Sequence, residues 1–253
     1  MNGNKWTKRS LIVLLVLICF LLALTVFFHE VFIFVAIAPI FALLDHPWTP
    51  KSLYITFLAA LMLVIAIVLV PKGGFVLHSL FYLAVIVELL VLYLIGQYRT
   101  KGRLNKFSLI IVCIGVEYLF LKLFIFENFL ADILQGKPSW TRWNIYTGYL
   151  GAGPWILLTN LLFYQAVFKK DKINGFLIAL GIAAIGLPML YSFDLTNNPV
   201  TKDQLIRLYS GDDTNLPMPY AVYGELISRT GAWVSILIII FTLVRAKTKK
   251  VAR

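Results

Sequence analysis

Cysteine, histidine and acidic side chains are all scarce in this sequence. Its 253 residues include 2 Cys, 3 His and 12 Asp plus Glu. Both cysteines, Cys19 and Cys113, lie inside apolar runs, which excludes a disulfide framework and a zinc site. Because apolar surroundings keep a thiol protonated and unreactive, we expect no catalytic cysteine. His29 and His46 lie at expected helix ends, where a solvated imidazole is the usual arrangement, so the sequence predicts no metal site.

Charged residues are also scarce in this sequence. Hydrophobic residues make up 60% of the chain and charged residues 14%, a composition too apolar for a soluble globular protein. Runs of about 20 apolar residues predict transmembrane helices. We therefore predict an all-α integral membrane protein that is one transmembrane domain over residues 1–253. Eight runs are expected to cross the membrane: Leu11–Phe28, Val31–Leu44, Leu53–Val70, Phe75–Ile95, Phe107–Phe126, Ile145–Phe168, Ile173–Tyr191 and Ala232–Val244.

The net charge of +11 does not indicate a nucleic-acid partner, because the basic residues lie in short clusters between apolar runs. Such clusters orient a membrane protein, with the excess of Lys and Arg on the cytoplasmic side. With eight crossings, 16 of the 23 basic residues fall on the side of both termini. The second run is short and contains Pro39, which also suits a re-entrant segment. If the second run were re-entrant, one of the basic clusters would lie on the outer side of the membrane. We therefore expect the second run to cross the membrane and both termini to be cytoplasmic.

The stretch Arg142–Asn160, RWNIYTGYLGAGPWILLTN, combines features of the point where a helix enters a membrane. Aromatic rings favour the headgroup layer, and glycines let another backbone approach closely. An amide within the apolar run, Asn160, needs a partner on a neighbouring helix. An ordinary anchored helix has the same residue types, so they do not by themselves indicate a binding site.

The order of these residues resembles the sixth membrane segment of bacterial apolipoprotein N-acyltransferases. Other stretches are similar to further segments of that family: Phe34–Asp45, Glu117-Tyr118-Leu119 and Tyr223–Gly231. The resemblance implies eight spans in the bacterial inner membrane and an opening between helices near the outer leaflet. The positions that match this lipid- or partner-binding groove are Glu117, Tyr118, Trp143, Tyr146, Gly148, Gly151, Trp155 and Asn160.

The family's catalytic domain has no counterpart here. In the acyltransferases a nitrilase-like domain with a Glu, Lys and Cys set occupies the connection before the last span. In this chain the corresponding connection, residues 192–228, is a short extracytoplasmic loop without cysteine. Within it, Thr201 and Gln204 predict a capping box that starts a short helix through Tyr209. The apolar side chains of this helix suit either the membrane surface or packing on other helices.

Two acidic residues are expected inside the spans, where a charge costs about 3 kcal/mol or more at the bilayer centre. We predict that Glu117 is a buried acid beside Tyr118 and Asn160, either at the groove or in a hydrogen bond between helices. For Glu88, a structural role as a buried polar residue is expected.

These features lead to three functional hypotheses. The first is a non-catalytic acyltransferase-like protein that binds acyl chains, a lipoprotein or a partner protein at the outer leaflet. The second is the membrane subunit of a split acyltransferase whose nitrilase-like subunit is a separate membrane or periplasmic chain. The third is a small transporter with Glu88, Glu117 and Lys122 as a relay, although the sequence shows no inverted repeat. No cofactor is expected, and membrane lipids are the expected partners.

Overall fold

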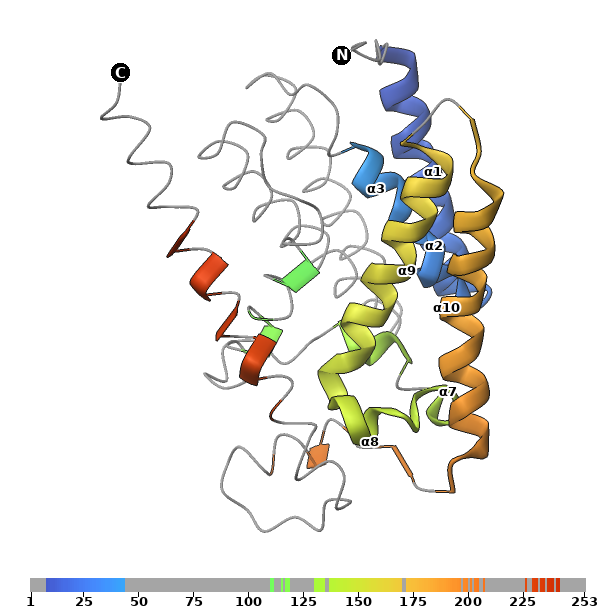
Figure 1. Cartoon of the computed structure of the whole chain (residues 1–253). Coiled ribbons are helices and arrows are strands. Elements are labelled where there is room, and N and C mark those ends of the chain that lie inside the picture. The colour runs from blue at the N-terminus through green and yellow to red at the C-terminus, as the bar shows by residue number, and fades with distance from the viewer. Residues whose placement is uncertain are drawn as a thin grey trace, which may run out of the picture. The chain divides into compact units, whose positions relative to one another are not determined.

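The computed structural model describes part of the chain, and all of its regular elements in that part are helical. The described residues are 8–43, 110–111, 115, 117–118, 130–134, 137–169, 172–196, 198–199, 201, 203–204, 207, 226, 229–231, 233–234, 236–238 and 240–241. Among them there is no β-strand, which confirms the predicted all-α class. Figure 1 shows the helices α1 to α3 and α7 to α10 in chain order.

Two helices in the described part are long and apolar enough to cross a membrane. The first runs from Tyr149 to Val167 and consists of the 3-10 turn η3, Tyr149–Gly151, and the helix α9, Ala152–Val167. The second is α10, Gly175–Asp194. They coincide with the sixth and seventh predicted runs. That the chain crosses the membrane eight times stays a prediction.

The chain divides into two compact units, and the boundaries fall inside α9 and α10. The first unit comprises Met1–Ala84 and Thr159–Ala183, and the second comprises Val85–Leu158 and Ala184–Arg253.

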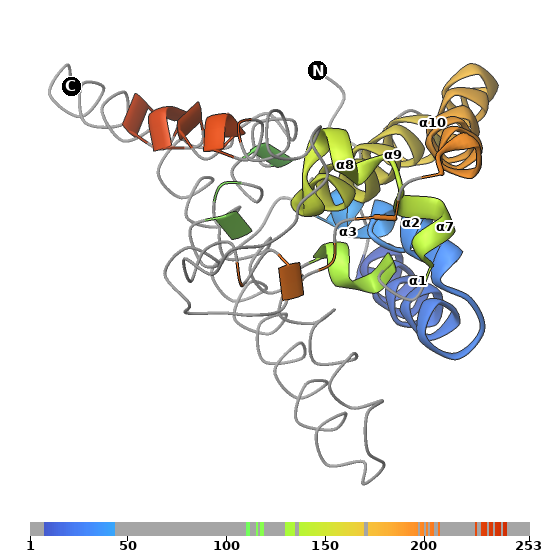
Figure 2. The same ribbon diagram turned by 90° about the horizontal axis from the view of Figure 1, so that it is seen from below.

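In the first unit, α1, Lys8–Phe27, packs against the short helices α2, Ile33–Ala36, and α3, Ala38–Leu43 (Figures 1 and 2). The second predicted run is therefore two short helices with a bend at Ile37. Residues 33, 34 and 36–42 of this run are buried, including Phe34 and Phe41. Phe41 contacts Tyr164 of α9, with ring centroids 6.1 Å apart, and the ring of Phe163 packs on Gly181 of α10. This apolar packing forms the core of the unit.

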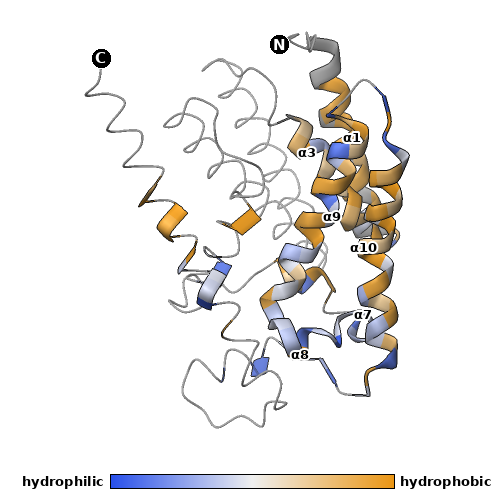
Figure 3. Ribbon diagram, in the orientation of Figure 1, coloured by the Kyte–Doolittle hydropathy of each residue, from blue (hydrophilic) through white to orange (hydrophobic). Residues whose placement is uncertain are grey.

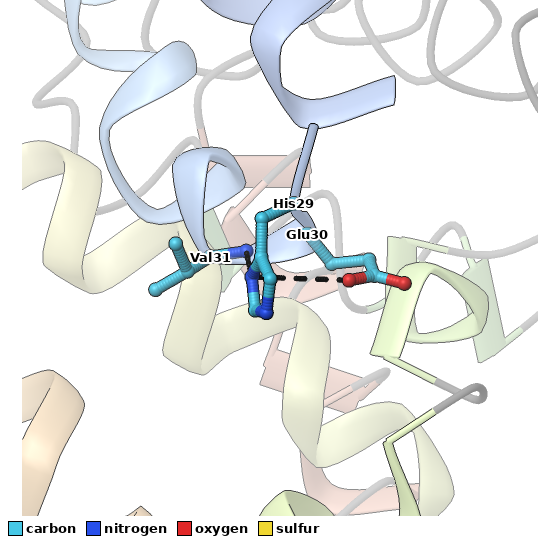
Figure 4. Close-up of polar contacts among 3 residues, drawn as sticks. All are labelled: His29, Glu30 and Val31. Atoms are coloured by element: carbon cyan, nitrogen blue, oxygen red, sulfur yellow. Dashed lines mark hydrogen bonds and ion pairs between the residues drawn. The ribbon is translucent and has the colours of Figure 1, made fainter. Parts of the chain in front are cut away.

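A single 3-10 turn, η1, Glu30–Phe32, connects α1 to α2. His29 is its N-cap, and the ring atom Nδ1 accepts a hydrogen bond from the backbone N–H of Val31 at 3.2 Å (Figure 4). The same Nδ1 lies 3.9 Å from Glu30 Oε2. His29 therefore caps the turn, and the carboxylate of Glu30 lies within ion-pair distance of the same ring.

The second unit contains the 3-10 turn η2, Leu130–Leu134, and two single-turn helices, α7, Pro138–Thr141, and α8, Asn144–Thr147. η2 contacts both η3 and α7. The predicted capping box is present: the N–H of Gln204 donates to Thr201 Oγ1 at 3.3 Å, and the N–H of Thr201 donates to Gln204 Oε1 at 3.0 Å. Residues 203, 204 and 207 are helical, as expected from this signal.

Candidate functional site

The candidate site is the aromatic turn, defined here as residues 142–151, which leads from α7 into α9. Pro138 fits the first turn of α7 because a missing N–H removes no intrahelical bond there. Gly148 has φ 82° and ψ 161°, a backbone conformation that is unfavourable for residues with a side chain. Helix α8 ends at this glycine, whose N–H donates to Asn144 O at 2.8 Å.

Gly151 closes the aromatic turn. A Cβ atom at Gly151 would lie 2.8 Å from Thr147 Cβ and 3.6 Å from a ring carbon of Trp143. The first distance is much shorter than a van der Waals contact. The glycine therefore allows close packing within the turn. The structure thus explains Gly151 by local packing, and a groove at this position stays a prediction.

The aromatic turn is attached to the C-terminal end of α10. Ser192 Oγ donates to Trp140 O at 3.0 Å and accepts from the N–H of Trp143 at 3.4 Å. Arg142 Nη1 donates to Leu195 O at 2.7 Å. This last bond places a cation at the carbonyl end of α10, where the helix dipole favours positive charge.

Two exposed tyrosines also connect the aromatic turn to α10. Tyr146 is 36% exposed and Tyr191 is 50% exposed. Their ring centroids lie 6.4 Å apart with an interplanar angle of 39°. An exposed pair of tyrosines near the ends of two apolar helices has the composition of an interfacial aromatic belt.

Trp155 has a structural partner within the second unit. Its Nε1–H donates to Ala184 O of α10 at 2.6 Å. In a regular helix this carbonyl would accept from the N–H of residue 188, but Pro188 has none. The indole therefore supplies the hydrogen bond that Pro188 omits. Trp155 also makes an edge contact with Trp143, with centroids 5.4 Å apart and rings at 90°.

Glu117 is buried, with 6% of its surface exposed, as expected of an acid in an apolar run. Its Oε1 accepts from the N–H of Leu130 at 3.1 Å. Its Oε2 lies 3.2 Å from the position that a Cβ of Gly153 would occupy, so this glycine gives the carboxylate room beside the first turn of α9. Tyr118, the next residue, is also buried.

The structure adds one polar contact that the sequence did not predict. The hydroxyl of Tyr149 donates to Asp132 Oδ1, and Tyr149 is buried while Asp132 is partly buried. A lone acid in the apolar segment Leu130–Leu134 is the signal that could have indicated it, because a partly buried carboxylate requires a donor.

Asn160 belongs to the first unit and has its partners there, which confirms the expectation that its amide bonds a neighbouring helix. Oδ1 accepts from the N–H groups of Ile37 and Ala38, both at 2.8 Å, and Nδ2 donates to Ile33 O at 2.8 Å. The amide thus stands between the N–H of Ile37 and the carbonyl of Ile33, the two groups that bond each other in a regular helix. Asn160 stabilises the bend between α2 and α3.

The remaining predicted residues lie outside the part of the chain that the structure describes. These are Glu88, His46, Lys122 and Cys113, together with the middle of the loop at residues 211–225. Among the described residues, no three His, Cys, Asp or Glu side chains are grouped so that they could hold a metal ion. Comparison of the chain with protein-family models, curated proteins and solved structures found no match.

Proposed function

We propose that this chain is a non-catalytic, multi-pass inner-membrane protein, resembling the membrane domain of the apolipoprotein N-acyltransferases. In this proposal it binds acyl chains, a lipoprotein or a partner protein at the outer leaflet. The exposed pair Tyr146 and Tyr191 carries the proposal, because it joins an aromatic turn to the end of an apolar helix.

The surface of α10 supports this proposal. Only 11% of its apolar window is buried, against 61% for Tyr149–Val167. Its exposed side chains include Phe176, Leu180, Ile182, Leu187, Leu190 and Phe193, and Figure 3 shows it hydrophobic along most of its length. A helix with this much exposed apolar surface is stable in water only when something covers it, and lipid does so without further protein contacts.

Mass spectrometry of what co-purifies with the full chain in mild detergent tests the proposal. We expect acylated molecules or one defined protein in stoichiometric amounts. Because Tyr146 and Tyr191 are exposed, Tyr146→Ser combined with Tyr191→Ser should leave folding intact and lower the co-purified amount several-fold. Co-purification that is unchanged in the double variant would refute a role of this pair. Capture of a nitrilase-like chain would instead support the split acyltransferase.

Topology is tested separately. A single cysteine at Asn215, in a background with Cys19→Ala and Cys113→Ala, should be labelled from outside the inner membrane by an impermeant maleimide. A cysteine at Lys170 should not be labelled. The reverse pattern would overturn the orientation on which an outer-leaflet site depends.

A further inference from the structure

The turn η1 is capped by a histidine rather than by one of the usual N-cap residues, which are Asn, Asp, Ser and Thr. His29 accepts two hydrogen bonds from this turn. Its Nδ1 accepts from the N–H of Val31 at 3.2 Å, and its carbonyl oxygen accepts from the N–H of Phe32 at 3.2 Å. The first N–H groups of a helical turn have no acceptor within that turn. The imidazole therefore supplies the acceptor that Val31 requires.

The bond to the imidazole exists only while the ring is neutral. Nδ1 accepts through its lone pair, and the proton of the neutral ring is then on Nε2. In a protonated imidazole both nitrogens are donors, so Nδ1 no longer accepts from Val31. Histidine ordinarily changes its charge between about pH 5 and pH 8, and 44% of the side-chain surface of His29 is exposed to solvent. Acidification over this range therefore removes the side-chain cap.

Glu30 offers the protonated ring a second partner. Its Oε2 lies 3.9 Å from Nδ1 of His29, and Figure 4 shows the carboxylate directed at the ring. This distance is too long for a hydrogen bond but is within reach of an ion pair. The side chain of Glu30 is 34% exposed, so it has room to approach the ring. The same nitrogen thus faces a backbone donor and a carboxylate, and its protonation decides which of the two it bonds.

The described elements that pack on η1 are α1 and α2, and neither brings a further charge close to the ring. α2 contains no ionisable residue. The ionisable residues of α1 are Lys8, Arg9 and Cys19. Cys19 precedes Phe27, the last residue of α1, by about 12 Å at the helical rise, and the two basic residues lie at the opposite end of the helix. Within these described elements, Glu30 is the charged group that faces the ring.

We propose that His29 is a pH-sensitive cap of the connection between α1 and α2. The neutral ring accepts from the N–H of Val31 and holds η1 closed. A ring that takes up a proton at Nδ1 donates to Glu30 and releases that N–H. The released turn leads directly into α2, where the carbonyl of Ile33 bonds Asn160 Nδ2, so protonation loosens the chain next to a buried contact.

This inference goes beyond the proposed function, because it needs neither a lipid nor a partner protein. In the proposed topology the connection between α1 and α2 lies on the outer side of the membrane, and the pH of that side then sets the state of the cap. The tests below use the purified full chain in detergent. Their failure leaves the proposed function standing, and a failure to bind lipid leaves the cap standing.

NMR of the full chain with isotope-labelled histidine tests the state of the ring. In a His46→Gln, His78→Gln background the ring of His29 is the one labelled side chain. At about pH 7.5 we expect its proton on Nε2 and none on Nδ1, and at about pH 5 we expect both nitrogens protonated. A proton on Nδ1 at the higher pH would overturn the proposal, because that nitrogen would then not accept from Val31.

Hydrogen exchange of the Val31 amide measures the effect on the turn. Its rate is expressed relative to that of an unprotected amide at the same pH, which removes the intrinsic pH dependence of exchange. We expect protection to fall about fivefold between about pH 7.5 and about pH 5, the equivalent of losing a typical N-cap. Equal protection at the two pH values would refute a pH-sensitive cap.

Three variants separate the cap from other titrating groups. His29→Asn keeps a good N-cap that does not titrate, so its protection of Val31 should be the same at both pH values, whereas His29→Ala should protect weakly at both. Glu30→Gln removes the partner of the protonated ring, so loss of protection should need a more acidic solution. A pH-dependent loss that persists in His29→Asn would assign the effect to another group. A Glu30→Gln profile identical to that of the unmodified chain would refute the exchange of partners.

Discussion

The segment Ile33–Leu43 and helix α10 each contain a proline, and α9 supplies a hydrogen-bonding side chain to each. In the first unit, Asn160 bonds the backbone at the bend between α2 and α3, close to Pro39. In the second unit, Trp155 bonds Ala184 O, the carbonyl that Pro188 leaves without a donor. The first segment is divided into two short helices, whereas α10 continues through its proline.

The difference follows from the chemistry of the two side chains. An amide both donates and accepts, so Asn160 can satisfy N–H and carbonyl groups together, and here it bonds three of them. An indole only donates, so Trp155 can satisfy one carbonyl and nothing else. A bend that frees groups of both kinds therefore needs an amide, while a proline within a continuous helix needs only a donor.

The largest effect is expected at the bend. Asn160→Leu keeps a side chain of similar size and removes three buried hydrogen bonds, so we expect a loss of about 3 kcal/mol or more in the free energy of unfolding. Chemical denaturation in mild detergent measures it. Leu158→Ala, at an exposed position of the same helix, is the control and should cost much less. A loss below about 1 kcal/mol for Asn160→Leu would show that the bend satisfies its own backbone.

A smaller loss in the free energy of unfolding is expected when Trp155 no longer bonds α10, and this loss should depend on Pro188. Trp155→Phe should lower the free energy of unfolding by about 1 kcal/mol, since it leaves one buried carbonyl unpaired. In a Pro188→Ala background residue 188 regains its N–H and can bond Ala184 O, so Trp155→Phe should then cost clearly less. A double-mutant cycle measures the difference. Equal costs in the two backgrounds would mean that Trp155 contributes by packing on Trp143 rather than through Ala184.

Part of this arrangement could be predicted from the sequence. Apolar runs and turn residues indicated the helices at α9 and α10, and Thr201 with Gln204 indicated the capping box. Burial of Glu117 and a helix partner for Asn160 followed from the high energy of unpaired polar groups in apolar surroundings. These predictions depend on residue type and local spacing alone.

Other contacts could not be predicted because they join residues far apart in the chain. The sequence shows that Pro188 frees a carbonyl, but not that the indole of Trp155 lies beside it. Asp132 and Tyr149 each call for a hydrogen bond, yet only the fold brings η2 next to η3. The bend at Ile37 likewise depends on Asn160, which lies 123 residues away.

The smallest change in the free energy of unfolding is expected for substitution of Pro39. This substitution also tests whether Pro39 and Pro188 differ in how they depend on a side chain of α9. Pro39 lies in the first turn of α3, where a missing N–H removes no bond within that helix, so Pro39→Ala should change the free energy of unfolding by less than about 0.5 kcal/mol.

The N–H that this substitution restores belongs to residue 39, whereas Asn160 bonds Ile33, Ile37 and Ala38. Pro39→Ala should therefore not reduce the cost of Asn160→Leu, in contrast to the relief that Pro188→Ala gives to Trp155→Phe. The same denaturation experiment on the double variant decides it. If Pro39→Ala does relieve Asn160→Leu, the segment has straightened into one helix in which Ile37 bonds Ile33 directly, and Pro39 rather than Asn160 causes the bend.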